Sequence, residues 1–187
     1  MDQRDLVERA QRGDHDAFAE LARAAVAQLD AAARLILRDP DLAHDAVQEG
    51  FLRAWRDLRG LRDPGRFDAW LRRLVVNACI DILRRRRHRA IEIDLAPIEI
   101  PAVGDFASAI VDRDTLDDAL AHLDPEWRAV VVMHYFLGMP LPEVAGTLGI
   151  PLGTAKSRLH RSIQDMRLTI GTDDTSDAAP YPGGQLA

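Results

Sequence analysis

Apolar residues recur at helical spacing along two stretches of the chain, and a segment containing proline and glycine separates them. Over residues 1–89, and again over 113–170, hydrophobic positions return every three or four residues, which predicts amphipathic helices. Residues 90–112 lose this spacing around Pro97, Pro101 and Gly104 and predict an extended linker. The alternation of apolar and polar residues that is typical of β-strands is found convincingly only over residues 91–95, inside that linker. The pattern predicts an all-α protein of two small helical domains, with a disordered tail over 171–187.

Two helices joined by a glycine-containing turn are expected within the second domain. Asp124 followed by Pro125 is a favourable helix start, and a buried stripe comes after it at Trp127, Val130, Val131, His134 and Leu137. A short helix near 142–148, a turn at 149–151 and a longer helix from about Leu152 then match the helix-turn-helix pattern.

The last of these helices has two opposite faces at about 100° per residue. Its apolar positions are expected to pack inward: Leu152, Ala155, Leu159, Ile163 and Met166. The far side carries hydroxyls and arginines that can bond base edges in a major groove: Thr154, Ser157, Arg158 and Arg161. Lys156 and His160 flank that row and suit phosphates. A merely solvated face of a helical bundle is the alternative that the pattern leaves open.

An earlier helix, around residues 45–58, also has two distinct sides. Its core stripe falls within about 60° of arc and comprises Val47, Phe51, Ala54, Trp55 and Leu58. The opposite side places an apolar residue among polar ones: Asp45, Gln48, Glu49, Leu52 and Arg56. An exposed leucine among charges is a solvation cost that a partner protein would relieve, although single exposed leucines are common.

The helix predicted over 67–87 combines a buried stripe with a mixed flank. The stripe is Phe67, Leu71, Leu74, Val75, Ala78 and Ile82, and the flank is Trp70, Arg73, Asn77, Asp81 and Arg84. An aromatic ring beside amide and guanidinium groups can stack on and bond an unpaired base. A core position for Trp70 and a positioning role for Asp81 are the alternatives.

Charge is unevenly distributed along the chain, whose formal net charge is −6. Residues 90–112 hold five acids and residues 171–187 hold three, with no base in either segment. Without those eight acids the remainder has a net charge of +2 and contains one dense cationic run, Arg84, Arg85, Arg86, Arg87 and Arg89. Such a run favours a polyanionic partner, so the overall charge does not exclude nucleic acid.

Several other functions are excluded by the residues that the chain contains. Its single cysteine, Cys79, cannot form an internal disulfide, and no Cys/His spacing resembles a zinc site, so we expect no metal and no cofactor. No stretch approaches the roughly 18 apolar residues of a membrane span. The N-terminus also lacks a signal-peptide core. We expect a cytoplasmic protein without membrane insertion.

Three segments resemble the extracytoplasmic-function (ECF) RNA polymerase sigma factors of the sigma-70 family. Residues 153–161 resemble the recognition helix of sigma domain 4, and residues 45–55 resemble the family's polymerase-binding helix. Residues 67–71, together with Asn77, Asp81 and 84–87, are similar to the region that reads the −10 promoter element.

The resemblance implies a sigma domain 2 over residues 1–89 and a sigma domain 4 over 113–170. The first would bind the clamp helices of the largest subunit of core RNA polymerase through Asp45, Gln48, Glu49, Leu52 and Arg56. It would capture single-stranded −10 DNA through Trp70, Arg73, Asn77, Arg84, Arg85, Arg86 and Arg87. The second would read duplex −35 DNA through Thr154, Lys156, Ser157, Arg158, His160 and Arg161.

The implied function is promoter-specific transcription initiation without catalysis, controlled by a separate anti-sigma factor. One departure from the family is proline at 140 and 151, where members often have serine at helix starts. Two competing interpretations stay open: a helix-turn-helix regulator that binds duplex DNA without polymerase, and a helical enzyme using carboxylates and histidines. Six scattered histidines give the enzyme little support.

Overall fold

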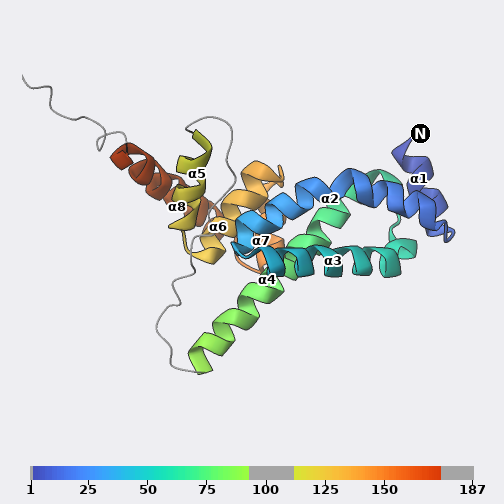
Figure 1. Cartoon of the computed structure of the whole chain (residues 1–187), viewed down its shortest axis with the longest axis horizontal. Helices are drawn as coiled ribbons and strands as arrows, with labels where there is room; N and C mark the ends of the chain where they lie inside the picture. Colours follow the sequence, from blue (N-terminus) through green and yellow to red (C-terminus); the bar gives the residue numbers. More distant parts are fainter. Residues whose placement is uncertain (1, 93–111, 174–187) are drawn as a thin grey trace, which may run out of the picture.

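The computed structural model describes residues 2–92 and 112–173, and every regular element within these two ranges is helical (Figure 1). The predicted all-α class is therefore confirmed. The N-terminal bundle comprises α1 (Gln3–Gln11), α2 (His15–Leu37), α3 (Pro40–Asp57), η1 (Leu58–Gly60), η2 (Pro64–Arg66) and α4 (Phe67–Glu92). The C-terminal bundle comprises α5 (Asp112–Ala121), α6 (Pro125–Val131), the π-helical η3 (Val132–Phe136), α7 (Leu141–Leu148) and α8 (Leu152–Asp173).

Aspartates start several of these helices by accepting hydrogen bonds from the first free backbone N–H groups. Asp14 accepts from Ala17 N at the start of α2, and Asp39 accepts from Leu42 N at the start of α3. Asp124 accepts from Glu126 N at 3.0 Å, directly before Pro125, as the sequence predicted. By contrast, α7 begins after Pro140 without a side-chain cap.

The core of the N-terminal bundle lies where α3 crosses α4. Gly50 of α3 is buried there, and a Cβ built on it would lie 2.4 Å from Val75 Cγ2 and 2.9 Å from Val75 Cα. Only a residue without a side chain allows this approach. The contact sets how closely α3 and α4 approach each other at this crossing.

The C-terminal bundle forms the predicted helix-turn-helix from α7 and α8. Gly149 ends α7 with φ +67°, a left-handed conformation that suits glycine, and the chain then turns into α8. Val144 of α7 and Ala155 of α8 are completely buried beneath this turn. The turn therefore holds α8 with its opposite face outward.

The two bundles pack directly against each other, α2 against α6 and η3, and α4 against α7 (Figure 1). Arg128 of α6 is only 2% exposed, and its Nε and Nη2 atoms both donate to the carbonyl of Ile36 at 3.1 Å. Its Nη1 atom donates to the carbonyl of Leu123 at 3.2 Å. Burial, reinforced by the nearby positive charge of Arg38, lowers the pKa of Arg128 to about 10. The sequence did not predict this interface.

The helices are longer than predicted at two places. Helix α4 continues through Glu92, because no proline or glycine interrupts it after Arg89, so Ile91 and Glu92 are helical rather than the start of a strand. Helix α8 continues through Asp173, past the predicted start of the tail at 171. The rest of the predicted linker, 93–111, and of the predicted tail, 174–187, lies outside the described residues.

One predicted core position is wrong. Leu152 is 39% exposed, because it is the first residue of α8 and lies nearly one turn before the first fully buried residue, Ala155. Ile163, Trp127 and His134 are half-buried, whereas Leu159 and Met166 lie in the core as expected. The periodicity therefore identified the buried face of α8 and misplaced its beginning.

Candidate functional site

The outer face of α3 has the exposure that the sequence predicted. Asp45, Gln48, Glu49 and Arg56 are all exposed, and Leu52 is 65% exposed. On the opposite side Val47, Ala54 and Leu58 are buried, while Phe51 and Trp55 are half-buried. The apolar side chain of Leu52 is therefore exposed to solvent at the centre of a polar face.

Ion pairs order the charged groups on this face. Glu49 accepts from Arg53 Nε at 2.6 Å, and Arg53 Nη1 lies 3.6 Å from Asp81 of α4. Arg56 donates to Asp57 at 3.1 Å, and this hydrogen bond is the main reason that the pKa of Arg56 is raised. Exposed pairs of this kind add little stability, so their rearrangement on binding a partner costs little.

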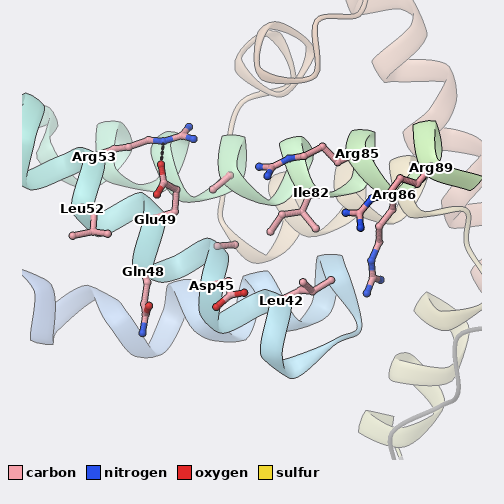
Figure 2. A pocket seen from close by; sticks show the side chains of 12 residues that line it. Leu42, Asp45, Gln48, Glu49, Leu52, Arg53, Ile82, Arg85, Arg86 and Arg89 are labelled. Carbon is pink, nitrogen blue, oxygen red and sulfur yellow. Dashed lines mark hydrogen bonds and ion pairs between the residues drawn. The ribbon is translucent and has the colours of Figure 1, made fainter.

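An open groove of about 690 Å³ lies between α3 and α4. Figure 2 shows the carboxylates of Asp45 and Glu49 on its α3 side and the guanidinium groups of Arg85, Arg86 and Arg89 on its α4 side. Apolar side chains complete the lining: Leu42, Ala46, Leu52, Ala78 and Ile82. The groove therefore combines an acidic wall, a basic wall and apolar contacts within one concave surface.

Part of this groove was not predicted from the sequence. Arg85 and Arg86 were predicted to bind nucleic acid, and Leu42 and Ile82 were not assigned to any binding site. The signal that could have joined the two helices is Gly50 in the middle of α3, where the absence of a side chain permits a close helix crossing.

The flank of α4 that was predicted to meet unpaired bases is partly accessible. Trp70 is half-buried, packs against the core, and has its ring centre 6.1 Å from that of Phe67. Arg73 is exposed and Asn77 is half-buried on the same flank. The tryptophan therefore has a structural role in the core and still presents part of its surface.

Four arginines of the cationic run have acceptors within the protein. Arg85 Nε donates to the carbonyl of Asp81 in its own helix at 3.2 Å. Arg86 Nη2 donates to Asp39 at 2.6 Å, and this bond adds to that from Leu42 N–H in lowering the pKa of Asp39. Arg84 Nη2 donates to the carbonyl of Leu148 at 3.0 Å, and Arg87 Nη1 donates to Glu126 at 2.8 Å. Two arginines of the run, Arg86 and Arg87, are therefore paired with a carboxylate in this arrangement, which the sequence did not predict.

The outward face of α8 is mostly accessible. Lys156, Ser157, His160 and Arg161 are exposed, and Ser157 Oγ donates to the carbonyl of Thr154 at 3.0 Å. Thr154 is half-buried. The side chain of Arg158 is 21% exposed, and its Nη1 atom lies 2.9 Å from Glu126 Oε2. Arg158 is thus less accessible than the helical pattern predicted.

Within residues 2–92 and 112–173 no cluster of three or more His, Cys, Asp or Glu side chains could hold a metal ion. Cys79 is buried, and desolvation raises the pKa of its thiol to about 12, which makes it unreactive at neutral pH. None of the helices in these ranges is long and apolar enough to cross a membrane.

A helix-turn-helix with a basic outer face, packed on a bundle with an exposed leucine in a polar face, is the arrangement expected of a DNA-binding protein of the transcription machinery. The family model for Sigma-70 region 2 matches residues 21–89, and the model for Sigma-70 region 4 matches residues 113–166. The chain belongs to the ECF RNA polymerase sigma factors. It is a polymerase-associated factor, and the interpretation as an independent helix-turn-helix regulator is not favoured.

Relatives of this chain support the assignment over most of their length. The ECF RNA polymerase sigma factor SigL of Mycobacterium tuberculosis is 38% identical over 135 residues, which cover 71% of this chain and 76% of SigL. SigM of the same species is 36% identical over 160 residues, covering 85% of this chain and 80% of SigM. SigE of Mycolicibacterium smegmatis is 35% identical, and the chain spans 56% of its length. Sigma factors are in general DNA-recognition subunits rather than enzymes.

Solved structures share the fold. CnrH, in complex with the cytosolic domain of CnrY, is 28% identical with a TM-score of 0.59, covering 94% of this chain and 99% of CnrH. The sigma factor RpoE of Bartonella quintana, in complex with the anti-sigma factor NepR, has a TM-score of 0.68 at 23% identity, covering 83% and 98% of the two chains. The similarity to RpoE, at 23% identity, shows a shared fold and nothing further.

Proposed function

We propose that this sigma factor docks on the clamp helices of core RNA polymerase through the outer face of α3. The observation that carries the proposal is Leu52, 65% exposed among Asp45, Gln48 and Glu49. A central apolar contact surrounded by polar groups is the usual anatomy of a protein interface. Arg56 extends the same face.

The DNA contacts are divided between the two bundles. In the N-terminal bundle, Trp70, Arg73 and Asn77 would meet unpaired −10 bases, and residues 84–87 would meet the adjacent phosphates. In the C-terminal bundle, α8 would enter the −35 major groove with Thr154, Ser157, Arg158 and Arg161 toward bases and with Lys156 and His160 toward phosphates.

Promoter opening follows from these contacts without a catalytic step. Binding energy at the −35 element positions the factor, and capture of flipped or unpaired −10 bases lowers the free-energy cost of strand separation. The chain therefore acts as a non-enzymatic subunit, with no cofactor of its own, in the cytoplasm where the polymerase is found.

Control by a separate anti-sigma protein completes the proposal. CnrH was solved with the cytosolic domain of CnrY, and RpoE of Bartonella quintana with its anti-sigma factor NepR. The groove between α3 and α4, with its basic and acidic walls and apolar lining, provides a surface on which such a partner could compete with polymerase.

Charge reversal at Glu49 tests the docking surface. We expect Glu49→Arg to weaken binding to core polymerase by more than about tenfold, because it places a like charge opposite the cations that an acidic face attracts. Glu8→Arg in α1 is the matched control, since the Glu8 side chain is 48% exposed and that of Glu49 is 47% exposed, and each pairs with an arginine four residues away. Equal losses in the two variants, measured by fluorescence anisotropy with labelled chain, would reject the surface.

A further inference from the structure

Lys156 is the only side-chain amine in the chain. Of the 24 lysine and arginine residues, all but Lys156 are arginines, and a guanidinium group stays protonated in proteins and does not attack acyl groups. A lysine amine that has lost its proton is a nucleophile. Cys79, the one thiol in the sequence, is buried. Lys156 is therefore the one side chain at which an acyl donor in solution would form an amide.

The position of Lys156 leaves its amine accessible. The residue lies in the second turn of α8 and is exposed, and no residue in the described ranges forms an ion pair or a hydrogen bond with its side chain. Arg158, two positions further along the helix, differs because its Nη1 atom lies 2.9 Å from Glu126 Oε2. The amine of Lys156 can therefore meet a reagent as readily as a DNA phosphate.

The preceding turn of α8 offers room for an acyl group. Long side chains in a helix lean toward the helix N-terminus, over the residues three and four positions earlier. For Lys156 these are Gly153 and Leu152. A Cβ at Gly153 would meet no atom of another element within 4 Å, and Leu152 is 39% exposed although it is apolar. An acetyl methyl group on the amine would therefore cover part of an exposed leucine, which is favourable.

The following turn of α8 provides a proton acceptor. His160 is exposed and lies four positions after Lys156, a spacing that puts two Cβ atoms about 5–6 Å apart on one side of a helix. Imidazole is the side chain that most often accepts protons in catalysis. The ammonium group of Lys156 must lose a proton before its nitrogen can attack, so His160 is placed to assist that step.

We propose that Lys156 is a site of Nε-acetylation by an acetyl thioester such as acetyl-coenzyme A, and that acetylation there weakens recognition of the −35 element. The inference rests on the proposed function, because it assumes that Lys156 contacts a phosphate of −35 DNA. Acetylation removes the positive charge that this contact needs. The face of α3 around Glu49 and Leu52 is unchanged, so the acetylated factor would still occupy core polymerase without reading its own −35 element.

The reaction balances without an oxidant or a reductant. The nitrogen of Lys156 forms an amide bond to the acetyl carbonyl carbon, and the carbon–sulfur bond of the thioester breaks. The ammonium group gives up two protons: one is taken up by the leaving thiolate, and the other passes through His160 to water. The products are a neutral acetyl-lysine and the free thiol of the coenzyme.

Incubation of the full chain with acetyl-coenzyme A tests the site. Peptide mapping by mass spectrometry should find the acetyl group on Lys156, formed at least about threefold faster than on a free lysine derivative, because a neighbouring base assists proton transfer. We expect His160→Gln to remove that advantage. His122→Gln is the matched control, since His122 is also exposed in the C-terminal bundle. Reaction at Lys156 no faster than at the free derivative would overturn the site.

Holoenzyme assembled from core polymerase and chain carrying acetyl-lysine at position 156 tests the effect on DNA. We expect its affinity for a labelled promoter duplex to fall by about threefold to tenfold, and the slope of log affinity against log salt to decrease by about one, as for loss of one phosphate contact. Binding to core polymerase should not change. Unaltered promoter affinity of the acetylated holoenzyme would contradict the inference.

Lys156→Arg separates acetylation of this residue from acetylation elsewhere. Its promoter affinity is measured before and after treatment with acetyl-coenzyme A, and we expect no difference, because arginine does not accept the acetyl group. An affinity loss in treated Lys156→Arg equal to that of the treated natural chain would assign the effect to another group and overturn the proposal. If Lys156 is acetylated but no form of the chain binds promoter DNA with polymerase, the proposed function fails instead.

Discussion

Gly50 shows how a single residue determines the candidate polymerase surface. It permits α3 to lie on α4, and the groove between these helices depends on that crossing. The residues that would touch polymerase lie on the outer face of the same helix. The buried Gly50 therefore helps to position α3, and the exposed Leu52 lies on the opposite face of that helix.

We expect Gly50→Ala to lower the free energy of unfolding by about 1–3 kcal/mol, because the added methyl group would overlap Val75 and force the helices apart. Gly146→Ala in α7 is the control. A Cβ at Gly146 meets no atom of another element within 4 Å, so alanine should stabilise the chain by about 0.5–1 kcal/mol. Urea denaturation followed by circular dichroism measures both, and a neutral or stabilising Gly50→Ala would contradict the tight crossing.

At the scale of single helices, periodicity in the sequence predicted which faces are buried. The outer faces of α3 and α8 were found because each side chain's angular position follows from its number in the helix. Exposure at the helix ends was harder to predict. Leu152 has the same angular position around the helix axis as the buried residues, but it is the first residue of α8 and lies before the helix reaches its packing partners. The helix start at Asp124 was easier to predict, because an aspartate followed by proline carries its own local signal.

The start of α3 has a measurable pH dependence. Asp39 caps the helix by accepting from Leu42 N–H and also binds Arg86, and these bonds lower its pKa below the ordinary value. A lowered folded-state pKa contributes stability that is present above the unfolded-state pKa and is lost as pH falls through the folded-state value.

We expect Asp39→Ala to cost about 1 kcal/mol at neutral pH through loss of the cap. Asp39→Asn keeps a capping side chain and should cost less, while removing the share of acid sensitivity that this carboxylate supplies. Unfolding measured at pH 7 and near pH 3 separates the two effects. An Asn variant with the full acid sensitivity of the natural chain would show that Asp39 is not responsible.

At the scale of the whole molecule, the interface between the bundles could not be predicted from the sequence. Arg128 bonds a backbone carbonyl 92 residues away, and a carbonyl acceptor has no residue type by which to recognise it. The arginine run looked like free positive charge because three of its acceptors, namely Asp39, the carbonyl of Leu148 and Glu126, lie far from it in sequence. Residue types indicated what each surface could bind, and tertiary packing determines which groups are free to bind it.

Promoter-dependent transcription tests the central claim most directly. A promoter identified by sequencing the RNAs induced on overproduction of the chain is transcribed in vitro by core RNA polymerase, with and without the purified protein. We expect a transcript from that promoter only when the chain is present, retained with Glu8→Arg and lost with Glu49→Arg. Equal transcription without the chain, or with Glu49→Arg at the natural level, would contradict the account of a sigma factor that docks through α3.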